Sequence, residues 1–186
     1  MTQEIYFAEF YKKALQHKID HSLKHSCGGQ PYQDYNQLFQ YVWKYRPKRV
    51  LEIGTGIGFT AASIKSAKPD CILDTIDFDS THIELARENL KEFKNINFLV
   101  GEAKNVLPEL EHEYDLIFFD GFSPQYRFLV EFNRLLKANG ILITANSHLK
   151  GPAGSTKEQY MQGLSDNFKW KLIDEFNDTK VIQKLF

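Results

Sequence analysis

The stretch of sequence that decides the fold runs from residue 50 to residue 58 and reads Val50-Leu51-Glu52-Ile53-Gly54-Thr55-Gly56-Ile57-Gly58. Its first half has the apolar pattern of a buried strand, and its second half is a glycine-rich turn that leads into a helix. Alternate glycines let the backbone turn sharply and approach a ligand closely, and the amides of a helix N-terminus point outward. In an open α/β sheet such a turn lies at the carboxyl end of a strand, where ligands bind.

Short apolar runs alternate with helical segments after Pro47. We expect strands over 49–53, 72–77, 96–100, 114–120 and 140–145, separated by helices over 57–67, 80–93, 103–110 and 126–138. This alternation predicts right-handed crossovers and a parallel sheet. Two further strand-like runs, 169–176 and 179–186, are joined by a two-residue link that suits a tight hairpin. The predicted fold class is α/β, a doubly wound, mostly parallel seven-stranded sheet with a C-terminal antiparallel hairpin.

Two of the predicted helices carry recognisable capping residues. The hydroxyl of Ser80 or Thr81 is suited to cap the N-terminus of the helix over 80–93. Gly140 follows the helix over 126–138, where a helix C-terminus favours a residue with positive φ.

Composition and charge narrow the class of protein. A chain of 186 residues, 42% hydrophobic and 25% charged, fits one globular domain with a real core. Its 23 basic residues nearly balance its 24 acidic ones, so we expect no non-specific binding to nucleic acid. Neither a signal-peptide pattern nor an apolar stretch of membrane-spanning length is present, and we expect no membrane association. The two cysteines, Cys27 and Cys71, form no disulfide pattern, which favours a cytoplasmic location.

The first 46 residues have a helical pattern, and we expect them to form a lid or cap segment of the same domain as residues 47–186. Within this segment Tyr32 is a candidate contact for the substrate. Three histidines recur every four residues on one helix face, and we interpret them as structural or solvated; they are His17, His21 and His25. A local basic cluster precedes the first strand, at the edge opposite the expected site, and we interpret it as a solvated connector; it comprises Lys44, Arg46, Lys48 and Arg49.

Polar residues also follow the second and third predicted strands. Asp77 ends the second strand, and a carboxylate there can accept hydrogen bonds from both hydroxyls of a ribose. Glu102 and Ala103 follow the third strand, where a polar group can meet the edge of an adenine. All these positions share one edge of the sheet with the glycine-rich turn.

These motifs, together with residues 114–120 (Tyr-Asp-Leu-Ile-Phe-Phe-Asp), resemble the successive motifs of class I S-adenosylmethionine-dependent methyltransferases, which have a Rossmann-like fold. The resemblance covers roughly residues 47–186 and implies S-adenosylmethionine as cofactor. By this resemblance Glu52 orients the loop that receives the methionine part, Asp77 holds the ribose, and Glu102 and Ala103 flank the adenine. The cofactor-binding residues that it implies are Glu52, Gly54, Thr55, Gly56, Gly58, Asp77, Glu102, Ala103 and Asp120.

Within this class the chain is most similar to small catechol/caffeoyl-CoA-type O-methyltransferases and to bacterial relatives that act on tRNA hydroxyuridine. Those enzymes hold a divalent metal with an Asp after the fourth strand and an Asp-Asn pair after the fifth, and they carry a Lys three residues beyond the first Asp. Here Asp120 and Asn146 match, but Ser123 and Ala145 replace the Lys and the second Asp. One carboxylate and one amide make a poor site for a hard cation. We therefore expect no bound metal, and Asp120 in direct contact with substrate or cofactor.

The loops after the fourth and fifth strands carry the remaining candidates. His148 is a candidate general base because its ordinary pKa lies near neutrality, although an exposed loop histidine explains it equally well. Tyr126 and Asn146 are candidate substrate contacts, and a role at the start of a helix is the alternative for Tyr126. Together with Asp120, these residues make up the expected reaction site.

The predicted activity is methyl transfer from S-adenosylmethionine to an oxygen, rather than a nitrogen, of a small molecule or a tRNA base. Aminopropyl transfer of the kind performed by spermidine synthase is an alternative, but the segment after Asp120 lacks the acidic residues that would bind an amine. A catalytically silent S-adenosylmethionine-binding domain is a second alternative, because the Lys and metal positions have changed. A homodimer is a possible assembly, which the sequence leaves open.

Overall fold

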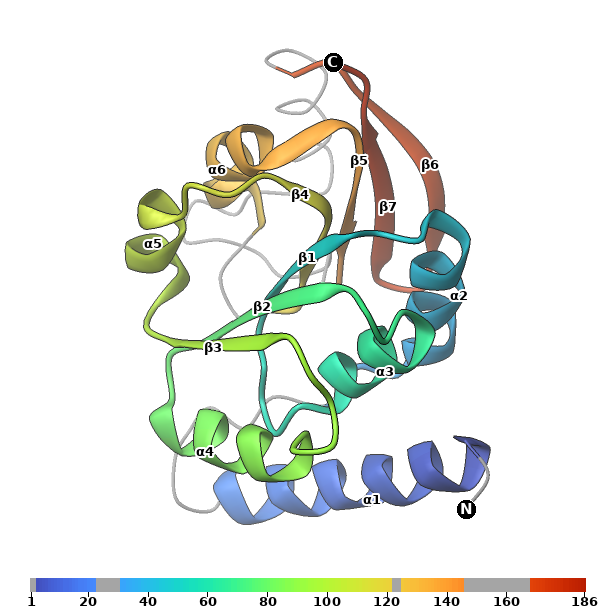
Figure 1. Cartoon of the computed structure of the whole chain (residues 1–186), viewed down its shortest axis with the longest axis vertical. Coiled ribbons are helices and arrows are strands. Elements are labelled where there is room, and N and C mark those ends of the chain that lie inside the picture. Colours follow the sequence, from blue (N-terminus) through green and yellow to red (C-terminus); the bar gives the residue numbers. More distant parts are fainter. Residues whose placement is uncertain (1–2, 23–30, 122–124, 146–167) are drawn as a thin grey trace.

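The computed structural model describes residues 3–22, 31–121, 125–145 and 168–186 of the chain (Figure 1). Its centre is a seven-stranded sheet with the order β3-β2-β1-β4-β5-β7-β6. The strands are β1 (Arg49–Ile53), β2 (Ile72–Asp77), β3 (Ile96–Val100), β4 (Tyr114–Phe119), β5 (Leu136–Thr144), β6 (Trp170–Phe176) and β7 (Thr179–Lys184). The helices are α1 (Gln3–Ser22), α2 (Tyr35–Tyr45), α3 (Phe59–Ala67), α4 (Ser80–Asn89), α5 (Ala103–Val106) and α6 (Leu129–Leu135), with short 3-10 turns η1 (Leu107–Glu109) and η2 (Gln125–Phe128).

Strands β1 to β5 run parallel, and β1 lies between β2 and β4. Ile53, the last residue of β1, pairs with Ile76 on one side and with Phe119 on the other. The carboxyl ends of these three strands are therefore level, and the turns that follow them meet at one edge. The tail forms the expected antiparallel hairpin of β6 and β7, which joins the sheet beside β5. The predicted fold class is confirmed.

Each face of the sheet buries its own apolar cluster, because successive side chains of a strand point to opposite faces. In β4, Leu116 and Phe118 face the first cluster, whereas Ile117 and Phe119 face the second. Residues of α1, α2, α3 and α4 cover the first cluster, and residues of α6 and η1 cover the second. Figure 1 shows this division, with α5 and α6 on the side of the sheet opposite α2 and α3.

The N-terminal helix α1 packs against the start of α3 through aromatic rings. Phe7 and Phe10 lie on one face of α1, and their ring centroids are 6.3 and 5.6 Å from that of Phe59, with edge-to-face geometry. Such edge-to-face pairs are favourable beyond the area that they bury. Phe59 is the first residue of the helix that follows the glycine-rich turn, so α1 is anchored next to that turn.

Several ends of elements differ from the sequence prediction. Asp79, rather than Ser80 or Thr81, is the N-cap of α4, and its side chain accepts a hydrogen bond from the amide of Thr81. The helix predicted over 103–110 divides into α5 and a 3-10 turn at Pro108, whose ring nitrogen has no hydrogen to donate to the helix.

The predicted helix over 126–138 ends already at Leu135 because β5 begins at Leu136, which pairs with Tyr114. The residue with positive φ in this region is Asn139, at 62°, so the prediction for Gly140 was wrong. No helix in the part of the chain that the structure describes is long and apolar enough to cross a membrane.

Candidate functional site

The glycine-rich turn leaves β1 with positive φ at three glycines, 102° at Gly54, 50° at Gly56 and 91° at Gly58. A Cβ on Gly54 would lie 2.7 Å from the carbonyl oxygen of Asp120, so this glycine permits the close approach of the turns after β1 and β4. A Cβ on Gly56 would meet no described atom within 4 Å. The turn is therefore packed tightly at Gly54 and open at Gly56, where a ligand can approach the backbone.

Asp77 connects this turn to the next one along the edge. Its Oδ2 accepts a 2.8 Å hydrogen bond from the amide of Gly56, and its Oδ1 accepts one of 3.0 Å from the amide of Asp79. His82 Nδ1 lies 3.3 Å from the same Oδ1. An ionised carboxylate offers roughly four acceptor sites. Described groups occupy three of these sites, so among the described residues about one is left, on Oδ2 beside Gly56.

Glu52 is fully buried below the turn and ties neighbouring elements together. One carboxylate oxygen accepts a hydrogen bond from the hydroxyl of Thr60 in α3, and the other accepts one of 2.6 Å from Thr75 in β2. Because Thr75 donates its only proton to Glu52, the 2.6 Å contact between the hydroxyls of Thr75 and Thr55 requires Thr55 to donate. Burial raises the pKa of Glu52 to about 7, against the effect of its two hydroxyl donors. Glu52 thus holds the base of the turn from a fully buried position.

The turn after β3 carries the residues expected at an adenine edge. Glu102 is exposed, precedes α5 as its N-cap residue and forms a 2.5 Å ion pair with Lys104. Two apolar side chains that the sequence motifs did not single out lie at the same edge: Phe78, 49% exposed, and Val100, 54% exposed. Phe78 follows Asp77 directly, and Val100 pairs with Asp77 in the sheet. An aromatic residue directly after a strand-terminal Asp is the sequence signal that would have found Phe78.

Asp120 follows β4, and its amide donates a 2.8 Å hydrogen bond to the carbonyl of Ile53. Tyr32 approaches the same edge from the segment before α2, with its ring centroid 5.1 Å from that of Phe118. Burial raises the pKa of Tyr32 well above its ordinary value, and the negative charge of Asp120 acts in the same direction. Tyr32 and Asp120, two of the predicted site residues, are therefore close enough for the charge of Asp120 to disfavour ionisation of the Tyr32 hydroxyl.

The other reaction-site candidates fall largely outside the described structure. Asn146, His148 and Ser123 lie outside the described residues, and Tyr126 lies in η2 without a described side chain. Ala145 is buried, and its amide donates a 2.8 Å hydrogen bond to the carbonyl of Phe119. A buried methyl group therefore stands where the resembling enzymes carry a second Asp. Among the described residues, no group of three or more His, Cys, Asp or Glu side chains could hold a metal ion.

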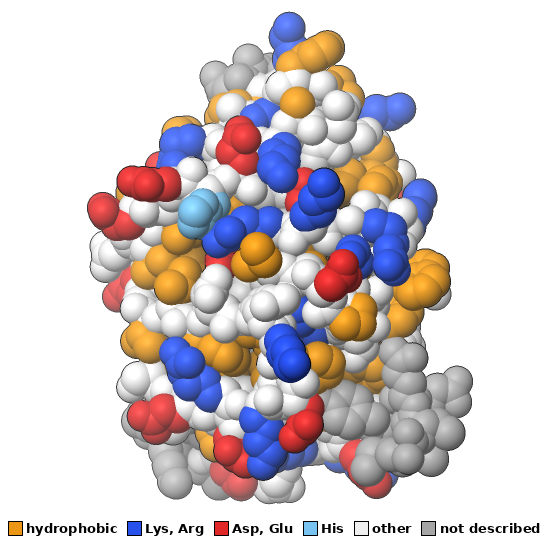
Figure 2. Space-filling view, viewed as in Figure 1, with side chains coloured by type: hydrophobic (Ala, Val, Ile, Leu, Met, Phe, Trp, Pro, Cys, Tyr) orange, Lys and Arg blue, Asp and Glu red, His pale blue; other side chains and the backbone are white. Residues whose placement is uncertain are grey.

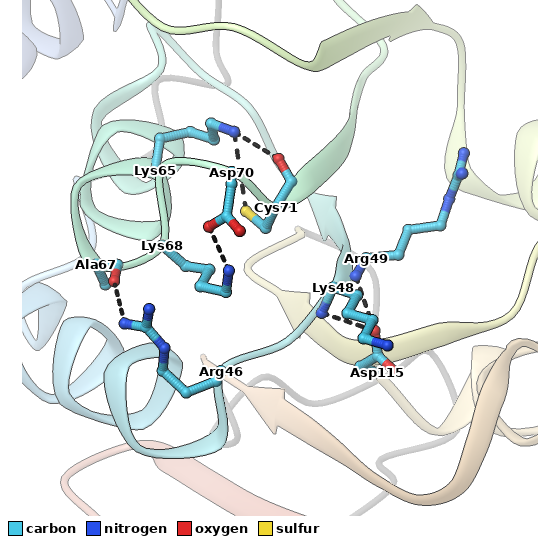
Figure 3. A network of polar contacts seen from close by, with 9 residues as sticks. All are labelled: Arg46, Lys48, Arg49, Lys65, Ala67, Lys68, Asp70, Cys71 and Asp115. Atoms are coloured by element: carbon cyan, nitrogen blue, oxygen red, sulfur yellow. Dashed lines mark hydrogen bonds and ion pairs between the residues drawn. The ribbon is translucent and has the colours of Figure 1, made fainter.

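The local basic cluster lies at the opposite, amino-terminal ends of the strands (Figure 3). Arg46 donates to the carbonyl of Ala67, and the amides of Lys48 and Arg49 both donate to Asp115 Oδ2 at 2.8 Å. Figure 2 shows that Lys and Arg side chains are spread over this view of the molecule among acidic and apolar ones. The contacts of the cluster join neighbouring elements of the fold, and it does not take part in the candidate site.

The strand order and the turns at this edge define a Rossmann-like α/β domain, with a candidate ligand site at the switch point of its sheet. A family model described as a methyltransferase domain matches residues 46–183. The chain belongs to this methyltransferase-domain family.

The chain is also similar to named relatives and to solved structures. A protein of Mycobacterium sp. (strain JLS) that bears a provisional O-methyltransferase name is 35% identical over 114 residues, which are 58% of this chain and 52% of the relative. The chain thus matches about half the length of such curated relatives. The O-methyltransferase TomG of Streptomyces achromogenes, solved with S-adenosylmethionine, is 20% identical with a TM-score of 0.76, and the match covers 100% of both chains. The O-methyltransferase of Bacillus cereus, solved with S-adenosylhomocysteine, is 16% identical with a TM-score of 0.70, over 95% of this chain and 90% of that one. At such identities the two structures support the fold alone.

Proposed function

We propose that this protein transfers a methyl group from S-adenosylmethionine to an oxygen of a small molecule or a tRNA base. The observation that carries the proposal is the hydrogen bond from the Gly56 amide to Asp77, beside the open side of Gly56, in a chain of the methyltransferase-domain family. The names of the relatives and of the structural neighbours favour oxygen as the acceptor atom.

The cofactor lies, in this proposal, along the edge from Gly56 to Glu102. The free acceptor site on Asp77 Oδ2 takes a ribose hydroxyl, and the exposed apolar side chains of Phe78 and Val100 flank the adenine together with Glu102 and Ala103. Gly54, Gly58 and Thr55 contribute through the backbone of the turn, because the Thr55 hydroxyl is already bound to Thr75. The bound cofactor supplies an electrophilic methyl group on a sulfonium, and the protein binds and orients it.

The acceptor binds, in this proposal, beside Asp120, between the turn after β4 and a cap formed by residues 1–46. Tyr32, Tyr126 and Asn146 are proposed substrate contacts, and Asp120 and His148 are the proposed catalytic residues. A divalent metal does not fit this residue set, because Ala145 offers no ligand where a second carboxylate would be needed. We therefore route no step through a metal. The cytoplasmic location and a homodimer remain predictions.

The proposal is tested by calorimetric titration of S-adenosylmethionine, its decarboxylated form and NAD, with and without magnesium. We expect S-adenosylmethionine to bind the wild type. We expect it to bind Asp77→Ala at least tenfold more weakly, because this variant lacks the charged carboxylate that would accept a hydrogen bond from the ribose. Asp70→Ala is the matched control, because Asp70 is an exposed carboxylate at the opposite edge. If no S-adenosyl compound binds the wild type, the proposal is wrong. Preference for the decarboxylated form would instead indicate aminopropyl transfer.

A second measurement separates the acceptors. The protein is incubated with methyl-tritiated S-adenosylmethionine and either a panel of small phenols or bulk tRNA, and transferred label is counted. Label on phenols or on tRNA identifies the acceptor class. Binding without transfer to either class supports the catalytically silent alternative, and a gain that needs magnesium contradicts the metal-free site.

A further inference from the structure

A histidine that the sequence motifs did not single out lies directly behind the proposed ribose contact. His82 is the third residue of α4, and its side chain is 10% exposed. The turn between β2 and α4 is short, so the first turn of the helix folds back over the end of the strand. This geometry brings His82 Nδ1 to 3.3 Å from Oδ1 of Asp77.

The three groups that hold the Asp77 carboxylate differ in kind. Gly56 and Asp79 donate from backbone amides in two turns. His82 approaches with a side chain of a regular helix, and since an ionised carboxylate can only accept, its Nδ1 is the donor. Unlike the two amides, a histidine ring can carry a positive charge. Asp77 also lies close enough to Glu52 for the two carboxyl groups to repel each other. A cationic donor therefore offsets repulsion that the two neutral amides leave in place.

The imidazole of His82 also packs against a second histidine ring, which comes from α1. His17 of α1 packs against it with ring centroids 5.2 Å apart and an angle of 67° between the rings. Burial lowers the pKa of His82, but the hydrogen bond to Asp77 and the negative charges of Asp77 and Asp79 outweigh it, so this pKa is raised. A raised pKa favours the form in which Nδ1 carries a proton and donates it.

We propose that His82 is a positioning residue for the cofactor, whose Nδ1–H holds Oδ1 of Asp77 so that the free acceptor site on Oδ2 faces the ribose. The inference rests on the proposed function, in which Asp77 binds that ribose. A carboxylate held in place before the ligand arrives loses less rotational freedom on binding. His17 supports the ring from α1, so the N-terminal helix contributes to the same arrangement.

The test compares substitutions of His82 that place a hydrogen-bond donor at different positions or remove it. The amide of His82→Asn places an N–H near the position of Nδ1, whereas that of His82→Gln places it near Nε2, and His82→Ala has none. We expect the dissociation constant of S-adenosylhomocysteine, measured by calorimetry, to rise about tenfold in His82→Ala and His82→Gln. We expect His82→Asn to recover most of this loss. His112→Ala, an exposed histidine in the segment before β4, is the matched control and is expected to bind as the wild type does.

Thermal midpoints measured on the same samples separate positioning from folding. Recovery of affinity in His82→Asn, with similar midpoints in His82→Asn and His82→Gln, supports the inference. Unchanged affinity in His82→Ala, or affinity in His82→Asn as weak as in His82→Ala, overturns it. In both cases binding by the wild type leaves the proposed function standing. Failure of the wild type to bind overturns the proposed function and the inference with it.

His17 provides an independent check, because it acts on the ring and not on Asp77. Loss of an aromatic pair is expected to weaken binding about threefold in His17→Ala. His17→Phe keeps an aromatic edge against His82 and is expected to recover part of that loss. Equal affinity in wild type and His17→Ala would show that α1 does not help to position His82 for cofactor binding.

Discussion

The hydroxyl of Tyr32 lies 2.8 Å from the hydroxyl of Thr179, and this hydrogen bond joins residues 147 positions apart. Tyr32 precedes α2 in the N-terminal segment, and Thr179 is the first residue of β7 in the C-terminal hairpin. Both residues are buried, so the bond links the segment before α2 to the start of β7 inside the core, near the edge where Asp120 lies.

Tyr32→Phe is expected to lower the free energy of unfolding by about 1–2 kcal/mol, because it leaves the buried Thr179 hydroxyl without this bond. Urea unfolding followed by far-UV circular dichroism measures the change. Tyr45→Phe removes a hydroxyl from a half-buried tyrosine of α2 and is expected to change stability by less than about 0.5 kcal/mol. Equal effects of the two substitutions would show that the bond to Thr179 is not stabilising.

Two glycines of the turn are expected to respond differently to alanine. Gly54→Ala introduces a Cβ 2.7 Å from a backbone oxygen at a φ of 102°, and we expect it to cost at least about 3 kcal/mol of stability. Gly56→Ala meets open space at a φ of 50°, so we expect a cost of only about 1 kcal/mol but at least tenfold weaker binding of S-adenosylhomocysteine. Unfolding and calorimetry on both variants check this separation. A Gly56→Ala variant that binds as the wild type does would contradict the proposed approach of the ligand.

The raised pKa of Glu52 predicts that the free energy of unfolding depends on pH. In the folded protein its pKa is raised to about 7, whereas an ordinary value near 4.5 applies to the unfolded chain. Between these two values the folded state binds a proton that the unfolded chain does not. The free energy of unfolding therefore falls as the pH rises from about 4.5, and the contribution of Glu52 is lost once the pH passes about 7. Relative to Glu52→Gln, which does not titrate, the wild type is expected to lose about 2–3 kcal/mol between pH 5 and pH 8. Parallel stability curves for the two proteins, from urea unfolding at each pH, would rule this out.

Asp74 joins β2 to three other strands, β1, β3 and β4, through one polar partner in each. It forms a 2.8 Å ion pair with Arg49 and accepts hydrogen bonds from Tyr114 at 2.7 Å and Asn97 at 2.6 Å. Its side chain is 4% exposed, so Asp74→Ala leaves these partners without their acceptor and is expected to cost about 3–4 kcal/mol.

The control for this substitution is Asp70→Ala. Asp70 pairs with Lys68, but its side chain is 75% exposed, so no measurable loss of stability is expected. Guanidinium unfolding of both variants makes the comparison. A loss in Asp74→Ala as small as that in Asp70→Ala would mean that the buried ion pair contributes little.

Local patterns were sufficient for most of the fold. The strand over 49–53, the glycine-rich turn and the alternation with helices could be predicted because each depends on residues adjacent in sequence. Ends of elements were predicted less well. Asn139, not Gly140, adopts the positive φ, because pairing of Leu136 with Tyr114 converts the expected last turn of a helix into the start of β5. That pairing involves a neighbouring strand, so the local pattern does not contain it.

By itself the sequence determined the class of sheet, the glycine-rich turn and the carboxylate of Asp77 at the end of β2. These features follow from local preferences of backbone and side chain, which a pattern of neighbouring residues expresses directly. Only the tertiary structure decided that His17 and His82 meet behind Asp77 and that Tyr32 meets Thr179. The physical reason is that side chains distant in sequence come together only after the helices pack on the sheet, and the packing depends on the whole core at once.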